Sequence, residues 1–313
     1  MRGTLLYIGQ RLVLIAVTTV LVSSVVFVLL HQIPGNAFLN ETRTSEATLR
    51  AELHHYGLDL PLQQQYTNWV TAVLRGDLGE SLVNRGVKIT PLLIRETSVS
   101  ATVGFFALII TVGFGMLLGV IASLRQNTWV DYVASSAAVV GYSVPAFVIA
   151  IFMLLIFGHY FYDWTQGTVY YNVGWGDWTQ IPVPAIALGL PYASYVARLT
   201  RASMLETIRT DYVRTAWAKG LKPRIVVIRH ALRNALIPVV TILGPLTTGI
   251  ITGSVVIENI FGIPGLGKEF VTSILARDYN IVIGVFTFYA ALVGLANLAV
   301  DVIYPALDPR IRY

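Results

Sequence analysis

The sequence predicts an all-α integral membrane protein with six transmembrane helices, and its composition and charge distribution support this fold class. Apolar residues make up 55% of the 313 residues and charged residues only 12%, about half the charged fraction usual in soluble domains. With a mean hydropathy of +0.66, the chain has too few polar residues to cover the surface of a soluble globule. A disordered chain is excluded as well, because disorder needs low hydrophobicity and high charge. The sequence has no Cys, which excludes disulfides, thiolate metal sites and cysteine nucleophiles.

The spans are predicted from intervals without charge, because about 20 helical residues cross the hydrocarbon core of a bilayer. The fourth interval is the least regular, since it contains three Pro, which leave carbonyls that neighbouring helices or water must satisfy. An even number of spans places both termini on one side. The predicted spans are Leu12–Leu30, Thr97–Leu124, the residues between Asp131 and Asp163, Trp178–Ala197, Asn234–Ile257 and Tyr279–Val300.

The first span is predicted to be an uncleaved anchor. Arg2 and Arg11 precede its apolar run, as in a signal peptide, but the run is 19 residues long and no small-x-small cleavage site follows it. The charge distribution then predicts cytoplasmic termini. With that orientation, 14 of the 22 basic residues and five of the 17 acidic residues lie inside, giving +9 inside and −4 outside. This asymmetry follows the positive-inside rule.

The loop after the first span, residues 32–96, is predicted to be extracytoplasmic and helical. Ser45 can cap a helix that runs to about Tyr56 and ends at Gly57, and Pro61 can begin a second helix. Two compatible interpretations stay open for this loop. It is either a helical cap packed on the outer membrane face or a docking surface for an external partner.

The predicted inner loop, residues 198–233, carries nine basic residues against Glu206 and Asp211. Asp211 can cap a short helix that Gly220 ends. Such a helix on the cytoplasmic face suits insertion into a cleft of another protein. The alternative is that the basic loop only fixes topology and contacts anionic lipid. Binding of nucleic acid is not expected from a short basic loop between spans.

This loop also carries a family resemblance. Its DYVRTAWAKGL and RHALRNALIPVV resemble the cytoplasmic loop of binding-protein-dependent ABC importer permeases, in particular the oligopeptide, dipeptide and nickel branch. The N-terminal pattern and the final DPRIRY resemble the first (B-type) permease subunit of an oligopeptide importer. Further matching segments are LHQIPGNAF, YGLDLPLQQQY, RGDLGES, GYSVPAF, GIITGSVVIENIFGIPGLGKEFV and DVIYPALDPRIRY.

The resemblance implies the importer permease fold and a non-enzymatic subunit of an ATP-driven importer in a bacterial inner membrane. It divides the chain into residues 1–31 with the first span, the loop 32–96 and a core permease domain, 97–313. The implied partners are a second permease subunit, two ATPases and an external peptide-binding protein. ATP and Mg are expected in the ATPases, and no cofactor or metal in this chain. Oligopeptide is the first expected cargo, with dipeptide and nickel as alternatives.

The same resemblance implies that the short inner helix couples the permease to the ATPases. Importer loops in general have Glu-Ala-Ala where this chain has Arg214, Thr215 and Ala216, a loss that many members of the branch share. Trp217 stands where the branch usually has Arg. The predicted coupling residues are Asp211, Tyr212, Arg214, Thr215, Ala216, Lys219, Gly220 and Leu221.

A translocation pathway is predicted near the third and fifth spans. A helix-kinking Pro there stands among aromatic and hydroxyl side chains, and packing against a neighbouring helix is the alternative. A carboxylate at the end of the fifth span is costly if it faces lipid; Glu258 is therefore expected to contact peptide or to pair with a basic residue such as Lys268. The predicted pathway residues are Tyr142, Ser143, Pro145, Phe147, Ser254 and Glu258.

Several other patterns are weighed against this interpretation. Gly262–Glu269 approaches the P-loop pattern, but Glu269 replaces the hydroxyl that would bind Mg²⁺. Glycines spaced four apart, at 115 and 119 and at 249 and 253, predict close helix packing. A secondary transporter would need carboxylates within its spans, and these spans hold acids only near their ends. A membrane enzyme would need a catalytic constellation, which the sequence does not suggest.

Overall fold

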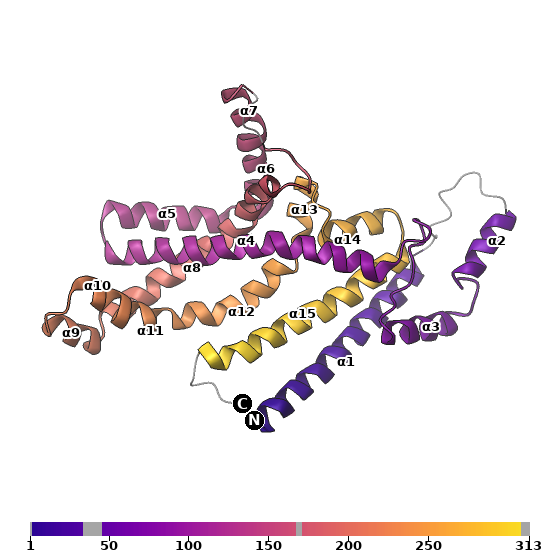
Figure 1. The fold of residues 1–313 in the computed structure, drawn as a ribbon, viewed down its shortest axis with the longest axis horizontal. Coiled ribbons are helices and arrows are strands. Elements are labelled where there is room, and N and C mark those ends of the chain that lie inside the picture. The colour runs from indigo at the N-terminus through magenta and orange to yellow at the C-terminus, as the bar shows by residue number, and fades with distance from the viewer. Residues whose placement is uncertain (1, 34–45, 167–170, 308–313) are drawn as a thin grey trace. The chain divides into compact units, whose positions relative to one another are not determined.

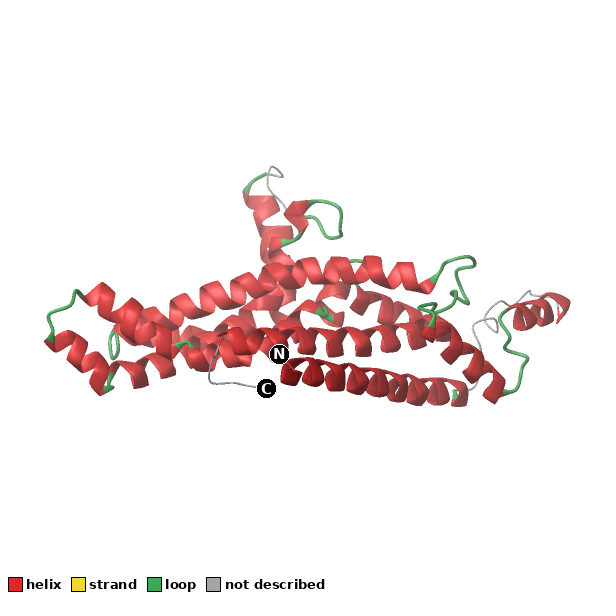
Figure 2. Ribbon diagram, turned by 60° about the horizontal axis from the view of Figure 1, so that its bottom comes forward, coloured by secondary structure: helices red, strands yellow, loops and turns green. Residues whose placement is uncertain are grey.

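The computed structural model describes residues 2–33, 46–166 and 171–307. Within these ranges the regular structure is helical, with one isolated bridge between Glu80 and Lys88 and no strand. Short loops join most of the helices (Figures 1 and 2). The predicted cap Ser45 lies outside the described residues. The α-helices are α1 (Arg2–Gln32), α2 (Glu46–His55), α3 (Leu62–Leu74), α4 (Ile89–Leu124), α5 (Trp129–Ser143), α6 (Ala146–Leu155), α7 (Phe161–Trp164), α8 (Pro182–Ile208), α9 (Asp211–Ala218), α10 (Pro223–Ile225), α11 (Arg233–Ala235), α12 (Ile237–Ile251), α13 (Val255–Phe261), α14 (Leu266–Leu275) and α15 (Tyr279–Leu307).

Four helical segments in the described ranges are long and apolar enough to cross a membrane, or five if one bent pair counts as a single span. The bent pair joins residues 223–235 to Ile237–Ile251 at 51°. Six spans are therefore not all recovered from length and apolarity. The four segments are Leu6–Gln32, Ile89–Leu124, Ala146–Trp164 and Tyr279–Val302.

The predicted fourth span is helix α8, which is not among these apolar segments. Its Pro and Tyr residues and Arg198, Arg201 and Glu206 lower its mean hydropathy. Fourteen of its 27 residues are buried, and α5 and α6 pack against it. A helix enclosed by other helices needs less apolar surface than one that faces lipid, so composition alone underestimates α8.

The predicted third span is two helices rather than one kinked helix. Helix α5 ends at Ser143, and α6 begins at Ala146. Val144 and Pro145 between them have extended backbone angles, with ψ of 126° and 140°. Pro145 has no N–H to donate to an upstream carbonyl, and a proline disfavours helical angles at the preceding residue. The α-helix therefore stops before Pro145 and restarts after it.

The chain forms two compact units, residues 1–99 with 264–295 and residues 100–263 with 296–313. In the first unit, an apolar core forms around the start of α4 and the first half of α15. Its buried members are Leu78, Ile89, Leu93, Leu266, Ile281 and Val285.

A buried carboxylate fastens the loop after α3 to the start of α15 in this first unit. Asp278 is 1% exposed. Its oxygens accept hydrogen bonds from the Ser81 hydroxyl and from the backbone N–H groups of Leu82, Val83 and Ile281. Donors from two segments far apart in sequence therefore converge on one side chain.

The second unit is held together by glycines that let helix backbones approach closely. A Cβ atom at Gly115 of α4 would lie 2.6 Å from the Ala193 carbonyl oxygen of α8, and one at Gly119 would lie 2.5 Å from the Ala197 oxygen. The close packing predicted for this pair is confirmed. The same prediction is wrong for Gly249, where a Cβ would have no neighbour within 4 Å.

Candidate coupling and translocation sites

Helix α9 is the short helix that the sequence predicted between α8 and α12. It begins at Asp211, and its N-cap is Thr210, with extended angles of −72° and 153°. The prediction that Asp211 caps the helix is therefore wrong by one residue. The Thr210 hydroxyl does not cap by its side chain either, because it donates to the Thr207 carbonyl instead. At the other end, Gly220 has φ of +73°, which ends the helix as predicted.

The inner face of α9 packs on its own loop. Val213 is 1% and Ala216 4% exposed, and both pack with Val226, while Leu221 covers their edge. The apolar residues at positions 213 and 216 are three apart, so they share one helix face. This cluster holds α9 in a defined place on the chain.

The outer face of α9 is exposed. The rings of Tyr212 and Trp217 are 42% and 43% exposed. The Asp211 and Arg214 side chains are 99% and 70% exposed and lie 3.7 Å apart. Thr215 and Lys219 are exposed as well. The face includes Tyr212, Arg214 and Trp217, and Tyr, Arg and Trp are the residue types that protein interfaces most often use as anchors.

The eight predicted coupling residues therefore fall into two groups. Ala216 and Leu221 belong to the inner cluster and do not face outward. Val213 and Trp217 lie in the helix but were not among the predicted coupling residues. The spacing of Val213 and Ala216 could have predicted the inner face from the sequence. No sequence pattern predicted that Trp217 is exposed. The six exposed residues are Asp211, Tyr212, Arg214, Thr215, Lys219 and Gly220.

Helix α9 is also connected to the long helices of its unit. The Tyr212 hydroxyl accepts a hydrogen bond from the Asn234 amide at 2.8 Å. Met204 of α8 is buried with Ala231 and Ala235. Helix α9 therefore contacts the segment that precedes α12, and that segment in turn packs against α8.

An ion pair fixes α8 to α5 near the same end of α8. The Arg201 guanidinium donates to both oxygens of Asp131 at 2.7 Å. Asp131 is 2% exposed, and it also accepts from the Asn127 N–H and the Ser135 hydroxyl. Planar two-point pairing of this kind is the strongest form of a carboxylate–guanidinium contact.

A cavity of about 300 Å³ lies among α5, α6, α8 and α12 of the second unit. Two tyrosines and one hydroxyl give it polar edges, and the remainder of its wall is apolar or backbone. Its lining combines aromatic faces with a few hydrogen-bonding groups, which is typical of a site for a partly polar ligand. The lining residues are Tyr142, Ala146, Leu188, Pro191, Tyr192, Gly249, Gly253 and Ser254.

Two of the six predicted pathway residues, Tyr142 and Ser254, line this cavity. Ser143, Pro145 and Phe147 are exposed at the α5–α6 break and are not among its described lining residues. Glu258 lies in the interior of the unit, 2% exposed, where its Oε1 accepts from the Ser100 hydroxyl at 2.8 Å. Its described partner is therefore a hydroxyl of α4, which the sequence did not indicate.

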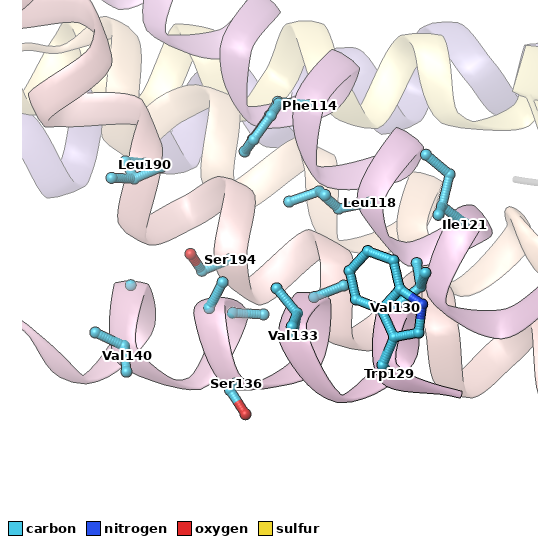
Figure 3. A pocket seen from close by; sticks show the side chains of 14 residues that line it. Phe114, Leu118, Ile121, Trp129, Val130, Val133, Ser136, Val140, Leu190 and Ser194 are labelled. Atoms are coloured by element: carbon cyan, nitrogen blue, oxygen red, sulfur yellow. The ribbon is translucent and has the colours of Figure 1, made fainter. Parts of the chain in front are cut away.

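A larger cavity of about 620 Å³ opens among α4, α5 and α8 (Figure 3). Its wall is almost entirely apolar, with Phe114, Leu118 and Val133 among the side chains that surround it. Ser136 and Ser194 are the only hydroxyl-bearing residues among the described lining, and Ser136 points away from the space in Figure 3. The smaller cavity is therefore the better candidate for polar cargo.

The P-loop-like segment at Gly262 has a different local structure from a nucleotide-binding loop. It follows a helix, α13, rather than a strand. Gly262 has φ of +68° and ends that helix. Residues 262–265 form the turn between α13 and α14, and Leu266–Glu269 are the first residues of α14.

Sequence comparison decides the family. The model of the family described as binding-protein-dependent transport system inner membrane component matches residues 115–313. The chain belongs to this family. A second model, for the N-terminal part of the membrane component of binding-protein-dependent transport systems, matches residues 4–88 of the permease.

Curated relatives match the permease over nearly its whole length. A dipeptide transport system permease protein of Bacillus subtilis is 40% identical over 98% of this chain and 97% of its own. An oligopeptide transport system permease protein of Escherichia coli is 37% identical over 95% of both chains. The family resemblance predicted from the motifs is confirmed.

Solved structures share the fold. The inward-facing MetNI methionine ABC transporter matches with a TM-score of 0.53 at 20% identity, over 69% of the permease and 96% of that chain. An amino acid ABC transporter crystallised with histidines matches with a TM-score of 0.52 at 19% identity, over 71% and 95%. The helical importer permease fold is thus confirmed.

Proposed function

We propose that this chain is the permease subunit of an ATP-driven importer of peptides. The observation that carries the proposal is the near full-length similarity to permeases of dipeptide and oligopeptide transport systems. Oligopeptides are the first expected cargo, because the N-terminal pattern and the final DPRIRY resemble the first permease subunit of an oligopeptide importer. Dipeptides and nickel are the alternatives. A cavity edged by Tyr142, Tyr192 and Ser254 suits the mixed polarity of a peptide backbone.

In the proposed complex this chain pairs with a second permease subunit and does not hydrolyse ATP itself. Two cytoplasmic ATPases would hold ATP and Mg and would contact the exposed face of α9. An external binding protein would deliver cargo on the side of residues 46–88. Both termini would be cytoplasmic in a bacterial inner membrane, as the charge distribution predicts.

The proposed coupling mechanism is mechanical. Closure of the ATPase dimer would displace α9, and the cluster of Val213, Ala216 and Val226 would move with it. The contacts of Met204 and Tyr212 would pass this displacement to α8 and to the segment before α12. Both α8 and α12 line the cavity, so its access could alternate between the two sides. The ATPases would bind α9 more tightly in one of their nucleotide states than in the other. That difference would set the direction of transport.

The proposal is tested with the purified complex in proteoliposomes. We expect this chain to copurify with a second permease and two ATPases, and labelled oligopeptide to accumulate only with ATP and the binding protein present. Accumulation without the ATPases would contradict the ATP-driven importer. Comparing peptides of two to six residues would separate oligopeptide from dipeptide cargo.

The role of α9 has its own matched pair of variants. Trp217→Ala removes an exposed ring from α9, and Trp178→Ala removes one that is 76% exposed elsewhere in the unit. Both variants should insert and assemble normally in the membrane. We expect Trp217→Ala alone to lower ATP-driven uptake, by about tenfold if the ring is an interface anchor. Equal uptake by the two variants would contradict the coupling role.

A further inference from the structure

One face of α8 extends the cavity toward a cation. Leu188, Pro191 and Tyr192 line the cavity, and Tyr195 and Arg198 follow at the spacing of three that keeps residues on one helix face. Side chains on a helix lean toward its N-terminus. The Arg198 side chain therefore leans back toward the cavity and away from the end of α8.

One aromatic ring contacts the Arg198 guanidinium, and a second ring stacks on the first. Its Cζ lies 4.7 Å from the centroid of the Tyr142 ring, within the range of a cation–π contact. The Tyr142 ring is stacked on Tyr195, with centroids 5.8 Å apart and planes at 29°. Tyr142 also lines the cavity, whereas Arg198 itself is not among the lining residues. The guanidinium therefore lies on a ring that borders the cavity.

The hydrogen-bonding capacity of Arg198 is unused within the described part of the chain. Its contact there is with the Tyr142 ring, with neither a hydrogen-bond acceptor nor a carboxylate partner. Arg201, one turn further on, has both oxygens of Asp131. A guanidinium has five donors in a planar fork that matches a carboxylate. Arg198 is exposed, so these donors are accessible to a ligand.

We propose that Arg198, held by the Tyr142 ring on which Tyr195 stacks, binds the C-terminal carboxylate of the transported peptide. This inference rests on the proposed function. Every linear peptide with a free C-terminus presents this group whatever its sequence. One fixed guanidinium at the cavity edge can therefore recognise the whole cargo class without selecting side chains, while Tyr192 and Ser254 line the space beside it.

The test compares a peptide with its C-terminal amide in proteoliposomes of the assembled complex. For each variant we measure the ratio of the uptake rate of the free acid to that of the amide. The same binding protein is used throughout, so its own preference cancels between variants. We expect Arg198→Gln to lower this ratio by about tenfold, as loss of a charge-assisted hydrogen bond would. Uptake of the amide should fall by a smaller factor, because its carbonyl can accept a hydrogen bond from the guanidinium but carries no charge. Arg209→Gln, an exposed arginine at the end of the same helix, is the matched control and should keep the wild-type ratio.

A second variant keeps the charge and removes its support. Tyr142→Leu should lower the ratio by a smaller factor, because the guanidinium loses its ring but not its donors. Equal loss of acid and amide uptake in Arg198→Gln, or no loss of either, would overturn the inference. Failure of Arg198→Gln to assemble would also overturn it, since an acid of the partner permease would then be the ligand, and dependence of the ratio on anionic lipid would point to a headgroup phosphate. If wild-type complex takes up neither peptide, the proposed function itself is wrong.

Discussion

At the scale of single residues, two buried carboxylates of the second unit have partners that explain their positions. Asp131 is paired with Arg201, and Glu258 is bonded to Ser100. A buried carboxylate is costly unless its oxygens are satisfied. Both acids therefore make structural contacts, and the contact of Glu258 with peptide stays a prediction.

The surroundings of Glu258 leave no room for a larger residue at Gly253. Gly253 has φ of +91°, and an added Cβ would lie 2.4 Å from Glu258 Oε1 and 3.0 Å from Ser100 Cβ. We expect Gly253→Ala to lower the free energy of unfolding by about 2 kcal/mol through strain and clash. Thermal unfolding in detergent measures this. Gly249→Ala, where the space is open, is the control and should unfold at or above the wild-type temperature.

The ion pair of Asp131 predicts a second stability difference. Asp131→Asn removes the charge that holds Arg201 and should destabilise the protein by about 2 kcal/mol, because the pair is largely buried. Asp211→Asn breaks a pair whose side chains are 99% and 70% exposed and should have almost no effect. Both are compared by denaturant unfolding in detergent. Similar losses in the two variants would contradict the assigned difference in burial.

At the scale of elements, helix α9 and the loop after α3 are short segments whose positions depend on a few contacts. An isolated helix as short as α9 is marginal in water, and the loop after α3 has no helix of its own. The first is fixed by the cluster around Val213, and the second by Asp278. Changes at these contacts should act locally, without affecting insertion of the long helices.

The end of α9 is sensitive at Gly220. Gly220 has φ of +73°, while the space around a Cβ would be open, so a side chain there strains the backbone without a clash. We expect Gly220→Val to insert normally but to abolish ATP-driven uptake, because the strain of about 1–2 kcal/mol shifts the end of α9. Uptake and membrane content are measured together. Ala202→Val, at an exposed helical position of α8, should keep normal uptake, and normal uptake by Gly220→Val would argue against coupling through α9.

The inner cluster of α9 offers a more severe change. Ala216→Asp places a charge beside Val213 and Val226, where it has no room or partner among the cluster residues. We expect insertion to persist and uptake to be lost through displacement of α9. Limited proteolysis should show faster cleavage within residues 211–222. Unchanged proteolysis with lost uptake would mean that the defect arises elsewhere.

Asp278 predicts a local loosening in the first unit. Asn keeps one acceptor oxygen but cannot accept from all of Ser81, Leu82, Val83 and Ile281, so we expect Asp278→Asn to speed amide hydrogen exchange of residues 81–84 by about tenfold or more. Asp77→Asn is the control, because its exposed carboxylate accepts only a local bond from the Gly79 N–H. Exchange that stays slow in Asp278→Asn would show that the loop is held by other contacts.

At the scale of the whole molecule, the sequence predicted the helical fold, the family and most long helices, because absence of charge over 20 or more residues is a local signal. It did not separate α5 from α6, since Pro145 could kink or end a helix. Its hydropathy underestimated α8 as a spanning helix, because α8 is buried by neighbouring helices rather than by lipid. The partner of Glu258 lies 158 positions away at Ser100, and no spacing rule connects such residues. For the same reason, only Tyr142 and Ser254 of the six predicted pathway residues are among the described lining of the smaller cavity.

The predicted topology can be mapped because the sequence has no Cys. Single cysteines at the exposed positions Asn84 and Lys219 would lie on opposite sides of the membrane under the positive-inside prediction. In right-side-out vesicles, an impermeant thiol reagent should label Asn84→Cys at once and Lys219→Cys only after permeabilisation. The cysteine-free parent is the blank. Labelling of both before permeabilisation, or the reverse order, would refute the orientation.

The apolar cluster beneath α9 has one further consequence. Since Val213, Ala216 and Val226 already hold the helix in shape within this chain alone, a protein that docks on its outer face need not order it. Association then loses little conformational entropy, so binding of an isolated ATPase should lack the large negative heat-capacity change that accompanies folding upon binding.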